Sequence, residues 1–345
     1  MIRLPSEPRR VLIVKPSALG DIVHALPVVA LLRKRFPAVE ISWLVTPAFA
    51  PLLEDHPHID RVWRFDRGPR GIGWRGVQTF GRLHGLQRQL RAYRFDLVLD
   101  LQGLFRSGWL AAQTMAPMRV GFGYAREGAP MFYTHKVRSR GVERHAIERY
   151  LDVAEELGCG RGPVAFEFGV SDATRARVRE QVGASPYCVL LPGTNWATKR
   201  WPVERFVTLA RRIEDERGIR CVLAGGNDVT ALVPADCGVA SLAGKTSLKE
   251  LVALLEGAAL VVANDSGPMH IAAALGRPLV SLFGPTNPVR TGPYARPDTV
   301  LRLDIVCSPC YRRTCVHHSC LRQLTDSHVM AAIGEQLVHL GIEQG

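Results

Sequence analysis

The feature that most restricts the fold of this sequence is an alternation of short apolar segments, rich in β-branched residues, with longer helix-like segments. In the first half, apolar segments at 10–15 and 40–46 are separated by a helical pattern at 21–36. This alternation is typical of βαβ units, in which helices cover both faces of a parallel sheet. We therefore expect the α/β class, with a doubly wound sheet in the first half.

The pattern begins again after residue 186, so the sequence predicts two Rossmann-like domains in tandem. The chain has 345 residues, more than the roughly 250–300 at which a single core usually stops growing. We expect a first domain at 1–165, a linker region at 166–186, a second domain at 187–326 and a C-terminal helix at 327–345 that packs back on the first domain. The Gly- and Arg-rich stretch 68–85 is expected to be a loop. Further strands are predicted at 61–65, 95–101, 118–122, 187–191, 219–224, 259–263 and 278–283, and further helices at 143–157, 202–217, 248–256 and 268–275.

The net charge of +12 lies mostly in the first half, because residues 1–160 hold 24 Lys and Arg against 15 Asp and Glu. A basic half indicates an anionic partner, such as nucleic acid, a phosphorylated lipid or an anionic membrane surface, or else a solubilising surface. The sequence contains no recognised nucleic-acid motif, which argues against nucleic acid. The apolar run Val11 to Val14 is too short for a signal peptide or a membrane span. We expect a cytoplasmic protein with reduced thiols.

The first motif is Lys15-Pro16-Ser17-Ala18-Leu19-Gly20-Asp21, between the first predicted strand and helix. In a doubly wound sheet the carboxyl ends of the strands face the ligand site, so this loop is in a functional position. It has neither the glycine spacing of a dinucleotide fingerprint nor that of a phosphate-binding P-loop. Its carboxylate, Asp21, has two open interpretations, a helix cap and a catalytic group.

The second and third motifs lie at equivalent positions in the second half. Residues 194–200, with hydroxyls and the cations Lys199 and Arg200, precede a helix that Pro202 is suited to begin. Asn264-Asp265-Ser266-Gly267-Pro268-Met269-His270 follows an apolar strand and opens a helix of small residues. Cations and free amide groups at a helix start are what a diphosphate needs. The alternatives are a solvated loop, a Ser266 cap and an interior His270.

Together these motifs resemble glycosyltransferase family nine, the ADP-heptose:lipopolysaccharide heptosyltransferases. The match runs in order through nearly the whole chain. It is carried by the stretches Val11 to Asp21, Asp100-Leu101-Gln102-Gly103-Leu104-Phe105-Arg106-Ser107, Gly193 to Pro202, Asn264 to His270 and Phe283-Gly284-Pro285-Thr286.

The resemblance implies the GT-B architecture, with the acceptor on the first domain and the nucleotide sugar on the second. It implies an inverting, metal-independent transfer of a heptose or related sugar from a nucleotide diphosphate, ADP-heptose, to a lipopolysaccharide core at the cytoplasmic face of the inner membrane. Asp21 resembles the family's general base and Lys199 its phosphate-binding lysine. Thr194, Asn195, Asp265, Ser266, Gly267 and His270 resemble its donor contacts. The cations expected to bind an acidic glycolipid acceptor are Arg67, Arg70, Arg106 and Arg126.

Two features depart from the family pattern. After Ala224-Gly225-Gly226 the family often carries a glutamate that contacts the ribose, whereas this chain has Asn227-Asp228. The other is a cysteine cluster, Cys307, Cys310, Cys315 and Cys320, whose spacing suits a structural zinc or iron site, with reduced thiols or labile disulfides as the alternatives. Other functions left open are another GT-B transferase, a nucleotide-sugar epimerase and a non-catalytic module that binds anionic ligands.

Overall fold

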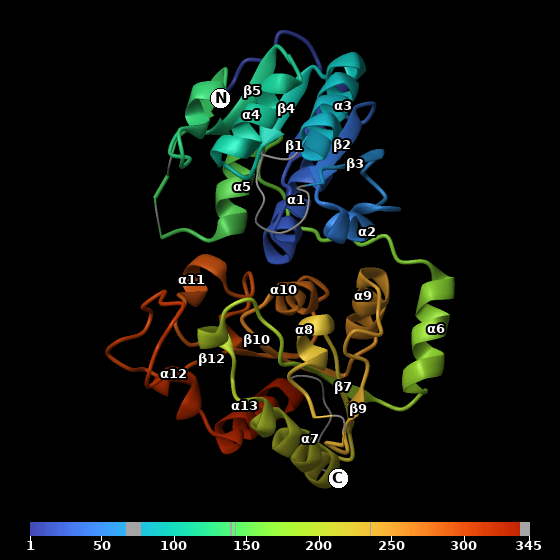
Figure 1. Cartoon of the computed structure of the whole chain (residues 1–345), viewed down its shortest axis with the longest axis vertical. Coiled ribbons are helices and arrows are strands. Elements are labelled where there is room, and N and C mark those ends of the chain that lie inside the picture. Colours follow the sequence, from blue (N-terminus) through green and yellow to red (C-terminus); the bar gives the residue numbers. More distant parts are fainter. Residues whose placement is uncertain (67–76, 139, 142, 235, 339–345) are drawn as a thin grey trace. The chain divides into compact units, whose positions relative to one another are not determined.

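The structure is a computed structural model that describes residues 1–66, 77–138, 140–141, 143–234 and 236–338. It divides into two compact units, Met1–Gly169 and Val170–Gly345, and Figure 1 labels the helices and strands of both. Each unit has a six-stranded parallel sheet with helices on both faces. The predicted α/β fold with two Rossmann-like units is therefore confirmed.

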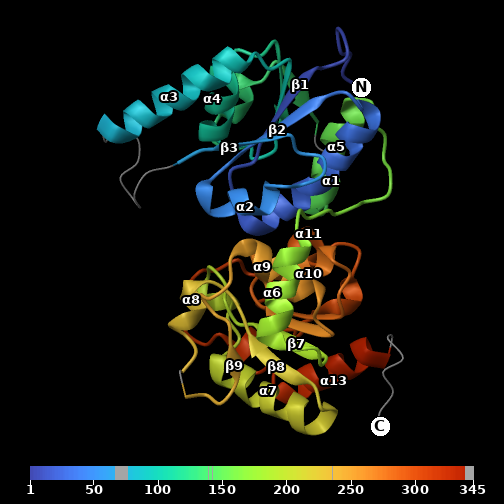
Figure 2. The ribbon, with the colours of Figure 1, turned by 90° about the vertical axis from the view of Figure 1, so that its right-hand side faces the viewer.

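In the first unit the sheet order is β3-β2-β1-β4-β5-β6. Figure 2 shows α1 and α5 on one side of this sheet and α3 and α4 on the other. Leu12 and Val14 of β1 belong to a buried cluster that also contains Leu90 of α3 and Leu110 of α4, and all of β1 except Arg10 is buried. A central parallel strand is covered on both faces, which explains its continuous apolar sequence. The strands are β1 (Arg10–Val14), β2 (Glu40–Val45), β3 (Arg61–Arg64), β4 (Leu97–Asp100), β5 (Met118–Phe122) and β6 (His135–Val137). The helices are α1 (Leu19–Arg35), α2 (Ala50–Leu53), α3 (Val77–Tyr93), α4 (Phe105–Gln113) and α5 (Ala146–Glu156).

The second unit repeats this plan with the order β12-β11-β10-β7-β8-β9. Ser247 caps α9 as its sequence predicts, because its hydroxyl accepts the Glu250 amide while the Glu250 carboxylate accepts the Ser247 amide. The strands are β7 (Tyr187–Leu191), β8 (Arg220–Leu223), β9 (Ala240–Ser241), β10 (Leu260–Asn264), β11 (Leu279–Leu282) and β12 (Val300–Leu301). The helices are α6 (Asp172–Val182), α7 (Val203–Arg217), α8 (Asn227–Thr230), α9 (Leu248–Glu256), α10 (Gly267–Ala274), α11 (Pro288–Thr291), α12 (Ser319–Arg322) and α13 (Asp326–Val338).

Three predictions about the connecting segments need correction. The expected linker 166–186 contains helix α6, whose Arg175 pairs with Glu256 of α9 at 2.7 Å. The expected loop 68–85 includes the start of α3 at Val77, while its residues up to 76 lie outside the described residues. Helix α13, expected to pack on the first domain, buries Val329, Ile333 and Leu337 in the core of its own unit, which also contains Phe206 of α7.

In each sheet, successive strands are added first on one side of the first strand and then on the other, so the strand order reverses once. In the first unit β1 lies between β2 and β4, and in the second β7 lies between β8 and β10. The loops after two adjacent strands at such a switch point diverge to opposite faces and leave room for a ligand. The switch points here are flanked by the loops 15–18 and 101–104 in the first unit, and by 192–202 and 265–266 in the second. The motifs at 15–21, 100–107, 193–202 and 264–270 therefore lie at switch points, while the motif at 283–286 follows the neighbouring strand β11.

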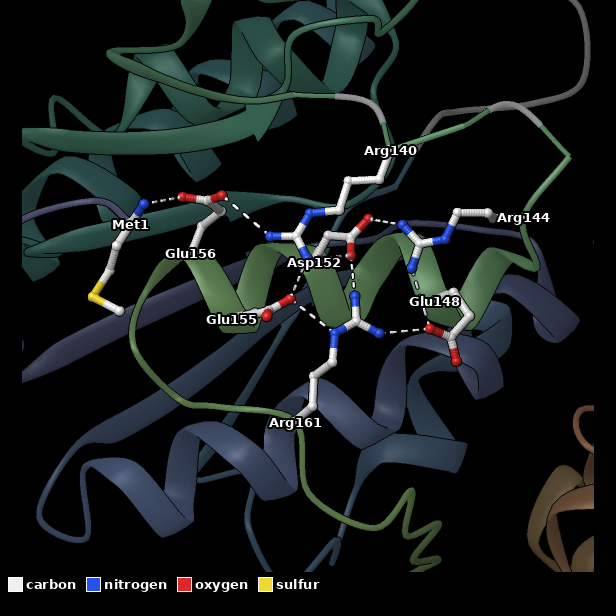
Figure 3. Close-up of polar contacts among 8 residues, drawn as sticks. All are labelled: Met1, Arg140, Arg144, Glu148, Asp152, Glu155, Glu156 and Arg161. Carbon is white, nitrogen blue, oxygen red and sulfur yellow. Dashed lines mark hydrogen bonds and ion pairs between the residues drawn. The ribbon is translucent and has the colours of Figure 1, made fainter.

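A chain of ion pairs fastens the outer side of α5 to the segments before and after it, as Figure 3 shows. Its centre is the buried carboxylate of Asp152, which contacts the guanidinium groups of Arg144, at 2.5 Å, and Arg161. Arg161 lies in the segment that leads out of the unit, so this cluster holds that segment against α5. The residues that Figure 3 draws are Met1, Arg140, Arg144, Glu148, Asp152, Glu155, Glu156 and Arg161.

The substitution Asp152→Asn should destabilise the first unit by on the order of 2–3 kcal/mol, because it leaves the guanidinium groups of Arg140, Arg144 and Arg161 without their buried anion. Glu155→Gln is the matched control. Glu155 also pairs with Arg161, at 2.8 Å, but its side chain is 33% exposed, so its loss should cost less than about 1 kcal/mol. Urea unfolding of both variants measures this difference, and equal losses would refute the central place of Asp152.

Candidate active site

Asp21 lies in the first turn of α1, where its carboxylate accepts the Ala18 amide at 3.3 Å. The same carboxylate lies 3.8 Å from the ammonium group of Lys15, and 41% of the Asp21 side chain is exposed. Asp21 therefore caps the start of α1 and also exposes its carboxylate to solvent. The capping interpretation is correct, and it leaves a carboxylate oxygen available for proton transfer.

Lys15 is a buried cation at the end of β1, and its ammonium lies 5.2 Å from the ring centre of Tyr150 on α5. Burial alone would lower the pKa of Lys15, but the charge of Asp21 and the contact with Tyr150 raise it above its ordinary value. Lys15 thus stays positively charged beneath Asp21. The sequence motif gives Lys15 no role of its own, although a lysine that ends an apolar strand needs a partner. Tyr150 has no local sequence signal.

The loop after β4 is held by the fully buried Asp100. Its carboxylate accepts hydrogen bonds from the hydroxyls of Tyr133, at 2.7 Å, and Ser107, at 2.8 Å, and from the amides of Gln102 and Gly103. Burial raises the pKa of Asp100, and the hydrogen bonds oppose that rise. Asp100 therefore fixes the backbone that leads into α4.

A cavity of about 290 Å³ lies beside this loop in the first unit. Pro16 and Gln102 place it at the switch point, because they follow β1 and β4. Arg106 brings a cation to its wall, and Glu127 accepts the Phe105 amide at 3.3 Å. The other lining residues are Phe65, Leu104, Phe105, Ser107 and Leu110.

The predicted acceptor arginines fall into two groups. Arg106 lines the cavity, and the exposed Arg126 flanks it, since its amide donates to the Gly103 carbonyl at 3.1 Å. Arg67 and Arg70 lie outside the described residues.

The second unit gathers its motifs around the buried Asp265, directly after β10. Its carboxylate lies 2.7 Å from the Lys199 ammonium and accepts the Thr286 hydroxyl at 2.6 Å. The hydroxyl of Thr194 donates to the Asp265 carbonyl at 2.9 Å. The loops after β7, β10 and β11 thus meet at one carboxylate, and Thr286 is the member to which sequence analysis gave no role.

Asn264, next to Asp265 in the sequence, hydrogen-bonds to both ends of the loop after β7. Its side-chain carbonyl accepts the Trp201 amide at 3.1 Å, and its amide donates to the Pro192 carbonyl at 2.8 Å. Gly193 has no room for a side chain, because a Cβ there would come within 2.6 Å of Val229. These contacts fix the position of the loop that carries Lys199.

The start of α10 supplies the remaining predicted donor contacts. Ser266 precedes the helix, Gly267 begins it, and His270 is buried in its first turn. The Ser266 hydroxyl is buried and has no hydrogen-bond partner among the described residues. Asn195 is exposed on the neighbouring loop. A free hydroxyl at a helix start, with a lysine nearby, is suited to bind an anion.

The family model of glycosyltransferase family 9 (heptosyltransferase) matches residues 83–320. The chain belongs to glycosyltransferase family 9. It is 32% identical to lipopolysaccharide heptosyltransferase 1 of Pseudomonas aeruginosa over 89% of this chain and 88% of that protein. It is 30% identical to lipopolysaccharide core heptosyltransferase OpsX of Haemophilus influenzae over 85% and 84% of the two chains.

Among solved structures, the E. coli heptosyltransferase WaaC with ADP-2-deoxy-2-fluoro heptose matches with a TM-score of 0.76 and 28% identity, over 94% of this chain and 99% of that one. The predicted family-9 membership, GT-B architecture and transferase class are therefore confirmed.

The predicted metal site at the cysteine cluster is not supported. Among the described residues, which include all four cysteines, no group of three or more His, Cys, Asp or Glu is arranged to hold a metal ion. Cys320 packs in the core of the second unit, where burial and the neighbouring thiols raise the pKa of its thiol. The Cys315 sulfur instead accepts the His318 amide at 3.3 Å.

Proposed function

We propose that this chain is an inverting transferase that moves a heptose from ADP-heptose to a hydroxyl of a lipopolysaccharide core. The family-9 relatives named as lipopolysaccharide heptosyltransferases match over most of the chain. The observation that carries the proposal is that each unit has its charged motif at a sheet switch point, with Asp21 in one and the cluster of Lys199 and Asp265 in the other.

Asp21 acts as the general base in this scheme. A sugar hydroxyl is a weak nucleophile, and a carboxylate within hydrogen-bond reach can take its proton during attack on the anomeric carbon. Attack from the face opposite the diphosphate inverts that centre. The Lys15 ammonium, 3.8 Å from the Asp21 carboxylate, helps to hold that carboxylate in place.

The second unit binds the donor. Lys199, the free Ser266 hydroxyl and the amides at the start of α10 stabilise the charge that develops on the departing ADP. Thr194, Asn195, Gly267 and His270 complete the phosphate contacts, and Asp265 holds the hydroxyls of the heptose. Lys199 and the amides at the start of α10 supply the positive charge that a divalent cation would otherwise provide. Asp228, at the start of α8 and close to Gly193, takes the place of the family's ribose-binding glutamate.

The first unit binds the acidic acceptor at its cavity. Arg106 and Arg126 flank that cavity, and Arg67 and Arg70 belong to the same proposed set. No described helix is long and apolar enough to cross a membrane. We place the protein at the cytoplasmic face of the inner membrane, where its basic first half meets the anionic glycolipid.

Release of nucleotide tests the proposal. The protein is incubated with ADP-, UDP- and GDP-sugars, with and without a lipopolysaccharide core acceptor. ADP release from ADP-heptose that depends on the acceptor is the expected result. Nucleotide release from UDP- or GDP-sugars but not from ADP-heptose would contradict the proposal. ADP release at the same rate with and without the acceptor would also contradict it.

Acceptor affinity should weaken as salt rises, since exposed charges are screened beyond the ~8 Å Debye length at physiological ionic strength. The substitution Arg106→Glu should weaken acceptor binding by about tenfold, because it puts a like charge beside the anion. Arg9→Glu is the control. It makes the same charge change just before β1, at the amino ends of the strands rather than at their carboxyl ends, and should change acceptor affinity little. Binding that is independent of salt and equal in both variants would show that the basic surface only aids solubility.

A further inference from the structure

The segment from Cys307 to Cys320 lies against the loop that carries Lys199. The hydroxyl of Thr198 donates to the Arg312 carbonyl at 2.7 Å, and the Thr198 carbonyl lies 2.7 Å from Nε2 of His318. A carbonyl only accepts, so His318 carries its hydrogen on Nε2. Both bonds span more than 110 residues of sequence, and they hold the segment beside the donor loop.

The beginning of the segment is fixed to the loop after β11. The Ser308 hydroxyl donates to the Gly284 carbonyl at 2.6 Å, and the amides of Cys310 and Tyr311 donate to the Pro285 carbonyl at 3.0 and 2.8 Å. The same loop carries Thr286, which bonds to Asp265. The segment is therefore hydrogen-bonded to two loops of the proposed donor site, those after β7 and β11.

These anchors bring Arg313 to the same aromatic ring that Lys199 contacts. The Arg313 guanidinium carbon lies 4.8 Å from the ring centre of Trp196, and the Lys199 ammonium lies 4.7 Å from the same ring centre. Lys199 has Asp265 as its anion, whereas the described residues offer Arg313 no carboxylate within ion-pair distance. Two cations at one indole ring repel each other, and an anion bound to both would relieve that repulsion.

We propose that Arg313 is a second cation for the donor diphosphate, which it binds together with Lys199. This inference rests on the donor site of the proposed function. The planar guanidinium matches phosphate oxygens with two parallel N–H donors. Stacking on Trp196 holds it in place before the ligand arrives. The role of the cysteine-rich segment is then to carry a phosphate-binding arginine.

Calorimetric titration of the full chain with ADP, AMP and adenosine tests this inference. The substitution Arg313→Gln should weaken ADP binding about tenfold and leave adenosine binding unchanged, with AMP between them. Arg313→Lys should restore part of the ADP affinity because it keeps the charge. Arg312→Gln is the matched control, since Arg312 is an adjacent exposed arginine that contacts the Thr198 hydroxyl through its backbone carbonyl, which the substitution keeps.

A purely structural role for Arg313 would weaken ADP and adenosine binding equally, and that result would overturn the inference. Equal effects of Arg313→Gln and Arg312→Gln would overturn it as well. If the unaltered protein binds ADP and Arg313→Gln binds it as tightly, the inference fails and the proposed function stands. If the unaltered protein binds no ADP, the proposed function fails with it.

Discussion

The substitution Asp21→Ala should slow sugar transfer by about 10²–10⁴-fold, the usual contribution of general acid–base catalysis. ADP affinity should stay within about twofold, because Asp21 belongs to the first unit and acts on the acceptor hydroxyl. Single-turnover rates and calorimetry with ADP measure the two effects separately.

Asp21→Asn is the sharper variant, because the amide oxygen can still accept the Ala18 hydrogen bond that closes the start of α1. It removes the base and keeps the cap. If Asp21→Asn transferred sugar at more than about a hundredth of the original rate, Asp21 would be a capping residue only.

The substitution Lys199→Ala should lower both donor affinity and the transfer rate, the rate by about 10²–10³-fold, as for the loss of one group that stabilises transition-state charge. The ammonium contacts Asp265 at 2.7 Å in a site where only 17% of the lysine side chain is exposed. Because a cation enclosed to this extent is weakly screened, its loss should remove most of its electrostatic attraction for a bound diphosphate.

Loss of Lys199 also removes the cation that pairs with the buried Asp265 carboxylate, which still accepts the Thr286 hydroxyl. Lys199→Gln keeps a hydrogen-bond donor for that carboxylate and removes the charge, so it separates folding from phosphate binding. Lys245→Ala, which removes a lysine bonded to the Ser241 carbonyl in the same unit, is the control. Unchanged ADP affinity in Lys199→Gln would remove Lys199 from the phosphate site.

The sequence predicts the two sheets well because a buried parallel strand needs a continuous apolar run. Strand β7, Tyr187 to Leu191, begins and ends where its apolar run predicts, and helix α9, Leu248 to Glu256, begins and ends where its helical pattern predicts. The position of the motifs is predicted for the same reason, since a loop after a central strand opens at the ligand edge of the sheet.

Helix α6 is missed because its sequence is largely polar and shows no clear apolar face. Its end signals are nevertheless present. The Ser171 hydroxyl accepts the Thr174 amide at 3.2 Å, and Gly183 has a positive φ of 80° at the end of the helix. Helix α13 is found in the sequence, but periodicity does not reveal which core it joins.

The contacts that assemble the site are the least accessible to sequence analysis. Tyr150 lies 135 positions after Lys15, and Arg313 lies 117 after Trp196, so no local spacing connects either pair. The cysteine spacing points to a metal, yet the residues between the cysteines are engaged elsewhere, as His318 is by Thr198. Spacing alone does not show whether the thiols adopt the arrangement that a metal needs, and among the described residues no group of three or more ligands has it.

The mass spectrum of a lipopolysaccharide core acceptor after incubation with this protein and ADP-heptose tests the central claim most directly. The account predicts an acceptor that is heavier by one heptose residue, and no such product with Asp21→Asn. An acceptor of unchanged mass, under conditions in which a known family-9 heptosyltransferase modifies it, would contradict the account.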